Sequence, residues 1–126
     1  MNPNKEISSR EEVKELVDSF YAKVNEDDLL SPVFNDFARV KWENHLPIMY
    51  DFWSSILLGD ASYRGNPFIK HMVLPIDKDH FSRWLDLFLE TVDERFTGAV
   101  AEEAKKRAGT IAGIFQYKME MLNQQR

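Results

Sequence analysis

The sequence predicts an all-α fold, and three observations lead to that prediction. Apolar residues recur every three or four positions along four long stretches, as they do on one face of an α-helix. Residues that cap helices, such as Ser9 and Gly59, flank these stretches. No stretch shows the alternation of apolar and polar residues that is typical of a β-strand.

The first predicted helix begins after Ser9. The run Ser9-Arg10-Glu11-Glu12 fits a capping box, in which a serine hydroxyl and a glutamate carboxylate satisfy free backbone N–H groups. The polar residues 25–28 end the helix. Its apolar stripe comprises Val13, Leu16, Val17, Phe20, Tyr21 and Val24.

A short helix is expected at Pro32, because a proline in the first turn loses no helical hydrogen bond. The second long helix is expected from about Val40 to Leu58, with Gly59 as its stop. Pro47 lies inside this range and must either kink the helix or mark its true start. One face of this helix carries Trp42, His45, Met49, Phe52, Trp53, Ile56 and Leu57.

Residues 59–66 are typical of a loop, and Asn66-Pro67 predicts a very short helix over residues 67–72. Asp77 can cap the next helix, and Thr97-Gly98 ends it. The stripe of that helix comprises Phe81, Trp84, Leu85, Phe88, Leu89, Val92 and Phe96. The last helix carries Ala101, Ala104, Ala108, Ile111, Ala112, Phe115, Met119 and Leu122. These helices suit a bundle or a globin-like sandwich, and the long connection 59–76, which holds a histidine, favours the sandwich.

The composition predicts one soluble domain over residues 1–126, with tails of about 1–8 and 123–126. A net charge of -5 argues against nucleic acid as a partner. The absence of cysteine excludes disulfides, thiolate catalysis and cysteine-ligated metals. The polar N-terminus does not resemble a signal peptide, and the longest apolar stretch, residues 54–58, is too short to cross a membrane. We therefore expect a cytoplasmic protein without a membrane partner.

Three histidines and an aromatic content of 13% are the features that could carry chemistry. The aromatic residues either fill a core or line a cavity for a large, flat ligand. His71 is either a ligand to a haem iron or a surface histidine near a helix C-terminus. His45 either projects over a ligand from its apolar face or packs in the core. His80, beside Asp79 at a helix start, is expected to be exposed to solvent.

Tyr21 and Trp84 each carry one hydrogen-bond donor on or beside an apolar stripe. Two such donors facing one cavity would favour an anion-like ligand such as dioxygen; otherwise both are core aromatics whose polar tips reach backbone carbonyls.

The sequence gives no support for other kinds of metal site or for nucleotide-binding and nucleophile motifs. Asp77 and His80 form a single Asp-x-x-His run without a second copy, and neither zinc-type spacing nor a glycine-rich nucleotide or nucleophile motif is present.

An ordered set of residues spans most of the chain, from about residue 13 to residue 115. Its members are Phe20-Tyr21, Pro32-Val33-Phe34, His45, Phe52-Trp53, Leu57-Leu58-Gly59, Tyr63, Gly65, Pro67, Lys70-His71, Leu74-Pro75, Phe81, Trp84-Leu85 and Phe88. No single member is specific, but their order and spacing together are. The combination resembles the group III truncated haemoglobins.

The resemblance implies a truncated globin fold, a two-over-two helical sandwich around haem b. It makes His71 the proximal iron ligand, and Tyr21, His45 and Trp84 the distal polar set. The haem pocket that it implies comprises Phe20, Phe34, Met49, Phe52, Trp53, Tyr63, Lys70 and Leu74. Tyr63, Arg64 and Lys70 are candidates for contacts with the haem propionates.

The implied function is the binding of dioxygen and other diatomic ligands, nitric oxide and carbon monoxide among them, for oxygen transport or sensing. The alternative is an enzyme that oxidises nitric oxide to nitrate or reduces peroxide, supplied by a reductase. A helical interaction module without a cofactor is the third hypothesis. Hydrogen bonds from Tyr21 and Trp84, at roughly 1.5–3 kcal/mol each, would slow dioxygen release on the order of a hundredfold or more, which suits chemistry or sensing better than delivery.

Overall fold

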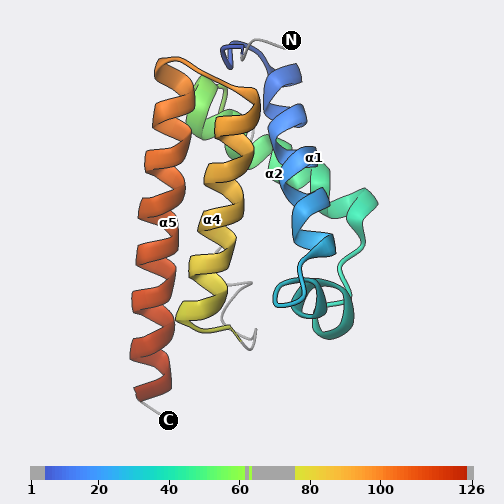
Figure 1. Cartoon of the computed structure of the whole chain (residues 1–126), viewed down its shortest axis with the longest axis vertical. Coiled ribbons are helices and arrows are strands. Elements are labelled where there is room, and N and C mark those ends of the chain that lie inside the picture. Colours follow the sequence, from blue (N-terminus) through green and yellow to red (C-terminus); the bar gives the residue numbers. More distant parts are fainter. Residues whose placement is uncertain (1–4, 62, 64–75, 125–126) are drawn as a thin grey trace.

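The computed structural model describes residues 5–61, 63 and 76–124, and these ranges are helical with short connections (Figure 1). The short helix predicted over residues 67–72 lies outside the described residues. Within those ranges no β-strand occurs, and the backbone pairing of Lys5 with Phe96 is an isolated bridge. The helices are α1 (Arg10–Glu26), the π-helix η1 (Pro32–Phe37), α2 (Trp42–Leu58), α4 (Lys78–Arg95) and α5 (Ala99–Gln124).

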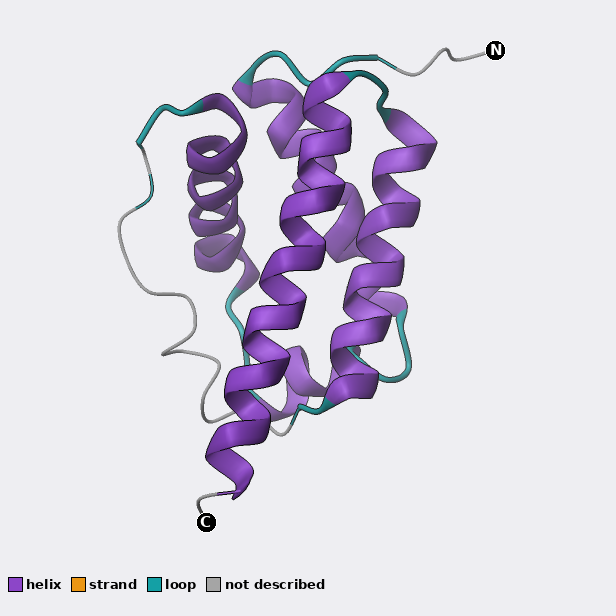
Figure 2. Ribbon diagram, turned by 90° about the vertical axis from the view of Figure 1, so that its left-hand side faces the viewer, coloured by secondary structure: helices purple, strands orange, loops and turns teal. Residues whose placement is uncertain are grey.

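The four long helices form two packed pairs. α1 packs against α2, α4 packs against α5, and the contact of α1 with α4 joins the pairs. α4 and α5 run side by side in opposite directions on either side of a short turn (Figure 1, Figure 2). This arrangement confirms the prediction of an all-α, two-over-two sandwich.

The start of α1 follows the predicted capping box. The backbone N–H and the hydroxyl of Ser9 both donate to Glu12 Oε1 at 2.8 Å, and these bonds hold the pKa of Glu12 below its usual value. All six residues of the predicted apolar stripe of this helix are buried. The local sequence therefore sets both where α1 begins and which face it turns inward.

α2 begins at Trp42 and continues through Pro47. Pro47 is therefore not the start of the helix. Because Pro47 lies in the second turn and is exposed, the carbonyl that loses its helical partner can bind water instead. Gly59 ends α2 with φ of +70°, and its N–H donates to the Ser55 carbonyl at 3.1 Å.

The segment before α1 is tied to the corner between α4 and α5. Lys5 N–H donates to the Arg95 carbonyl at 3.3 Å, and Thr97 N–H donates to the Lys5 carbonyl at 2.9 Å. The prediction that Phe96 belongs to the helix is wrong, because this pairing holds Phe96 in extended backbone just after α4 ends. Ile7, in the predicted N-terminal tail, is 1% exposed and belongs to the core.

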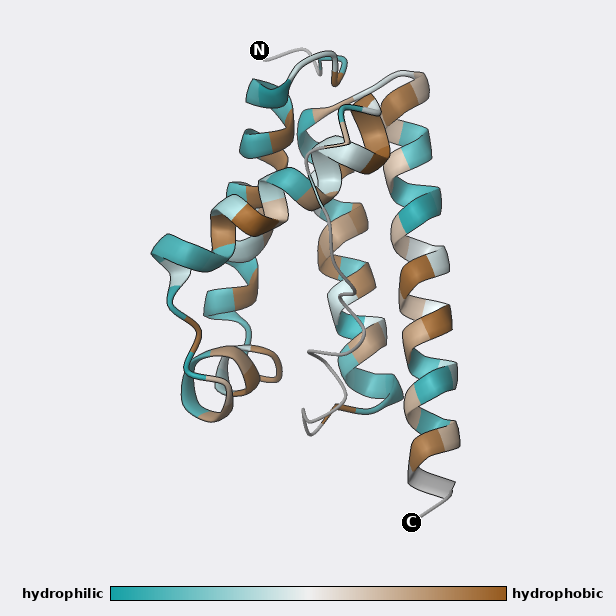
Figure 3. Ribbon diagram, turned by 180° about the vertical axis from the view of Figure 1, so that it is seen from behind, coloured by the Kyte–Doolittle hydropathy of each residue, from teal (hydrophilic) through white to brown (hydrophobic). Residues whose placement is uncertain are grey.

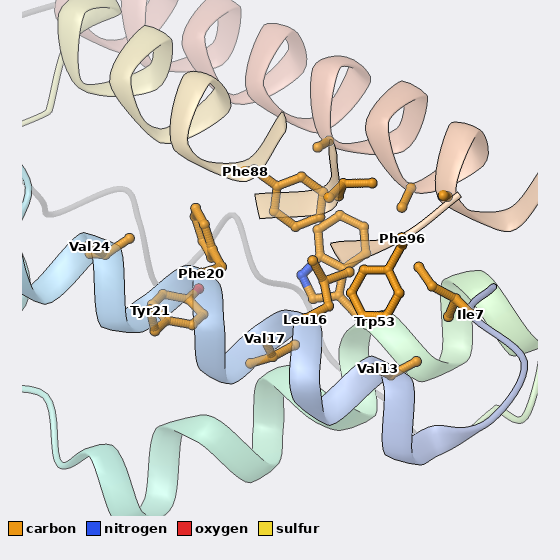
Figure 4. Packing of buried hydrophobic residues seen from close by; sticks show 14 of the residues in the cluster. Ile7, Val13, Leu16, Val17, Phe20, Tyr21, Val24, Trp53, Phe88 and Phe96 are labelled. Carbon is orange, nitrogen blue, oxygen red and sulfur yellow. The ribbon is translucent and has the colours of Figure 1, made fainter. Parts of the chain in front are cut away.

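The core lies between the two helix pairs and is rich in aromatic rings. The long helices carry both apolar and polar residues along their length (Figure 3). Phe88 lies at the centre, with ring centroids 4.7 Å from Trp53 and 5.2 Å from Phe20 (Figure 4). Trp84 stacks on the same Phe88 at 5.7 Å, so the core continues into the region around the tryptophan.

Candidate functional site

A pocket opens beside this aromatic core. It holds about 810 Å³ of space not filled by atoms, part of it open to solvent. All its lining residues are apolar or aromatic apart from two histidines. They are Tyr21, Leu30, Val33, Phe34, His45, Met49, Phe52, Trp53, Ile76, His80, Phe81, Trp84, Ile111, Ala112 and Phe115.

Tyr21 brings a buried hydroxyl to the pocket from α1. The residue is 5% exposed, and its O–H donates to Met49 Sδ at 3.2 Å. Burial raises the pKa of Tyr21 well above its usual value, and the smaller influence of the Trp84 indole on that pKa acts in the opposite direction. The hydroxyl is therefore protonated at neutral pH and can act as a hydrogen-bond donor.

His45 comes from the neighbouring α2 and lies against an aromatic cluster. Its ring centroid is 5.6 Å from that of Tyr21 and 5.5 Å from that of Trp42, both in edge-to-face geometry. Trp42 is itself fixed, because its indole N–H donates to Asn35 Oδ1 at 2.9 Å. The His45 Nε2 atom is buried. The imidazole is thus a partly buried polar group on the same wall as Tyr21.

Trp84 faces these two residues from α4. Its indole is held between Phe88, on which it stacks, and Phe20, whose ring lies edge-on at 5.5 Å. Three polar side chains from three helices, those of Tyr21, His45 and Trp84, therefore line one apolar pocket. α5 closes another wall with Ile111, Ala112 and Phe115.

The comparisons with known proteins agree with this architecture. The sequence profile of the bacterial-like globins matches residues 5–122. A group 3 truncated haemoglobin of Campylobacter jejuni is 33% identical over 115 residues, which cover 88% of this chain and 91% of that protein. This chain belongs to the bacterial-like globins, in group III of the truncated haemoglobins.

Two further similarities place this globin among known proteins. The crystal structure of a group III truncated haemoglobin from Campylobacter jejuni superposes with a TM-score of 0.84 at 31% identity, covering 93% of this chain and 95% of that one. A group 1 truncated haemoglobin of Nostoc commune is 31% identical over 102 residues, 79% of this chain and 80% of that protein. Family membership makes this chain a haem-binding globin.

The pocket of this globin suits haem. Broad apolar walls match a flat hydrophobic macrocycle, and imidazole is a common axial ligand of its iron. Among the residues that the structure describes, no cluster of three His, Asp or Glu side chains could hold a bare metal ion. None of the described helices has the length and apolarity needed to cross a bilayer.

Most of the predicted pocket residues that the structure describes line this one cavity. They are Phe34, Met49, Phe52 and Trp53, together with the three polar residues. Phe20 lies instead in the core behind Tyr21 and Trp84. Tyr63 packs its ring against Phe52 at 5.2 Å. The remaining predicted residues, His71, Lys70, Leu74 and Arg64, lie outside the described residues.

His80 departs from its prediction. The sequence predicts an exposed side chain at this position, but in the structure the side chain is only 17% exposed and lines the pocket. The imidazole Nδ1 lies 3.0 Å from Asp77 Oδ1, and this contact is the main reason why the pKa of Asp77 is lowered. The spacing of four residues between His80 and Trp84 places both on one face of α4, and this was the signal available in the sequence.

Proposed function

We propose that this globin binds haem b with His71 as the proximal iron ligand, and holds dioxygen and other diatomic ligands beside Tyr21, His45 and Trp84. One observation carries the proposal. Polar groups from α1, α2 and α4 converge on a single apolar pocket in a chain whose family binds haem. When bound, the haem iron supplies a coordination position for a diatomic gas.

The position of His71 in the chain supports its role. The segment that contains it runs between two described residues that border the pocket: Tyr63 contacts the lining residue Phe52, and Ile76 lines the pocket itself. His71 is five residues before Ile76. Five residues span at most about 17 Å, so the connectivity of the chain allows His71 to reach the pocket from Ile76.

Tyr21 and Trp84 supply the hydrogen bonds that would hold a polarised ligand. Since burial raises the pKa of Tyr21, its hydroxyl stays protonated, and an indole N–H is a donor at any pH. A diatomic ligand that gains negative charge accepts from both groups. Each such bond contributes about 1.5–3 kcal/mol, and the apolar walls exclude the water that would compete.

Haem titration of the haem-free chain tests the assignment of the iron ligand. We expect the wild type to develop a Soret band, and His71→Gly to lose the ferrous five-coordinate spectrum until imidazole is added. His80→Gly is the matched control, because His80 is a second histidine at the same pocket. An unchanged ferrous carbon monoxide spectrum and haem affinity in His71→Gly, with loss in His80→Gly, would show that the wrong histidine has been assigned.

Rapid mixing of the oxygenated protein with nitric oxide separates gas binding from enzymatic activity. A single slow turnover agrees with reversible binding as the role. Stoichiometric nitrate with sustained turnover under a reductant would instead establish nitric oxide dioxygenation at the same pocket.

A further inference from the structure

The hydroxyl of Tyr21 already has an acceptor inside the pocket. It donates to the thioether sulfur of Met49 at 3.2 Å, across the interface between α1 and α2. Met49 lies one helical turn after His45, and both residues line the pocket. This hydrogen bond therefore links α1 to α2 inside the pocket that Trp84 of α4 also lines.

We propose that Met49 is the resting acceptor of the Tyr21 hydroxyl, and that it tunes which ligands this pocket retains. The inference rests on the proposed function, in which Tyr21 donates to the bound ligand. A ligand can accept from Tyr21 only if the hydroxyl turns away from Met49. The stabilisation of the ligand is therefore the difference between two hydrogen bonds rather than the full value of one.

This competition discriminates ligands by their strength as acceptors. A thioether sulfur is a weak acceptor, so a ligand that carries negative charge displaces it readily. A ligand with little charge, such as carbon monoxide, gains little from Tyr21 and leaves the contact with Met49 in place. Met49 thus weakens the retention of dioxygen somewhat and leaves that of carbon monoxide nearly unchanged.

The surroundings of Tyr21 make a change of acceptor easy. The ring is fixed by Phe34 at 6.0 Å and Trp42 at 5.4 Å between centroids, so the phenol itself does not need to move. Rotation of the hydroxyl proton is enough to redirect the bond. Met49 is only partly buried, and its flexible side chain can withdraw by rotation about its own bonds.

Met49→Leu tests the proposal, because leucine keeps a similar volume and removes the acceptor. Met119→Leu is the matched control, since Met119 is a buried methionine of α5 outside the pocket. In haem-free protein labelled with ¹³C at the tyrosine Cζ, we expect the Tyr21 signal to shift in Met49→Leu and to stay in place in Met119→Leu. Tyr21→Phe assigns the signal. Met49→Ile provides a second apolar variant if the leucine variant folds poorly.

In the haem-loaded protein, dioxygen release should slow about fivefold in Met49→Leu, while carbon monoxide release changes less than about twofold. A Tyr21 signal identical in the wild type and both Met49 variants overturns the proposal, as does dioxygen release that is unchanged or faster. If the wild type binds neither haem nor dioxygen, the proposed function fails, whereas the haem-free measurement still decides whether Met49 holds the hydroxyl.

Discussion

Phe88→Ala is the substitution that most directly probes the core beneath the pocket. Phe88 is 0% exposed and contacts three aromatic rings, those of Trp53, Phe20 and Trp84. Removing its ring leaves a cavity that these side chains can fill only in part, because each of them also packs against other residues. Trp84 in addition loses the surface on which it stacks.

The expected loss follows from this burial. Phe-to-Ala changes in cores cost about 3–5 kcal/mol, and aromatic pairs contribute about 0.5–1.5 kcal/mol beyond area burial. With three ring partners and full burial, we expect a loss well inside that range, about 4 kcal/mol. Because domains of this size unfold with about 5–15 kcal/mol, the variant should still fold.

Urea denaturation of the haem-free protein, followed by circular dichroism, measures this loss. Phe37→Ala is the matched control, since Phe37 is 56% exposed on η1 and should change the unfolding free energy by less than about 0.5 kcal/mol. A loss below about 2 kcal/mol for Phe88→Ala, or equal losses for both variants, would refute the view that Phe88 is the centre of a tightly packed core.

Two further predictions concern the corner between α4 and α5 and the surface between α1 and α2. Gly98 has φ of +98°, and an added Cβ would lie 2.8 Å from Glu6 Oε1, so Gly98→Ala should lower the unfolding free energy by about 1–3 kcal/mol. Gly109→Ala, with nothing within 4 Å of the new atom, should not lower it in the same urea titrations; equal losses would contradict the argument from strain. Burial and the hydrogen bond to Asp18 raise the pKa of Tyr50 to about 12. The folded-state pKa therefore exceeds the unfolded value of about 10, so the contribution of Tyr50 to stability is complete below pH 10 and is lost as the pH rises toward 12. Tyr50→Phe should reduce the fall in unfolding free energy over that interval, and an undiminished fall would count against this reading.

The helices could be predicted because their signals are local. Ser9 and Glu12 lie within one turn of each other, and Asp77 caps α4 through N–H groups only two and three residues away. Periodicity then identifies the buried face, since burial of one apolar stripe dominates the stability of a surface helix.

Features that depend on distant residues could not be predicted in this way. Phe96 continues the apolar stripe of α4, but a backbone pairing with Lys5 ends the helix before it. Phe20 and Tyr21 are adjacent in sequence, yet only Tyr21 lines the pocket, because α1 turns Phe20 toward Phe88. The wall that α5 contributes was missed as well, since Ile111, Ala112 and Phe115 show the same pattern as ordinary core residues.

The pocket also has a consequence for the life of the chain in a cell. A molecule bound in the pocket adds van der Waals contacts to the apolar side chains that line it, so it stabilises the folded chain. A molecule that binds only the folded state adds about 2.7 kcal/mol at a hundred times its dissociation constant. Proteases that attack transiently opened chains act according to the unfolding free energy. We therefore expect the cellular half-life of this protein to lengthen when the occupant of its pocket is plentiful, so that supply of the ligand governs how much of the protein persists.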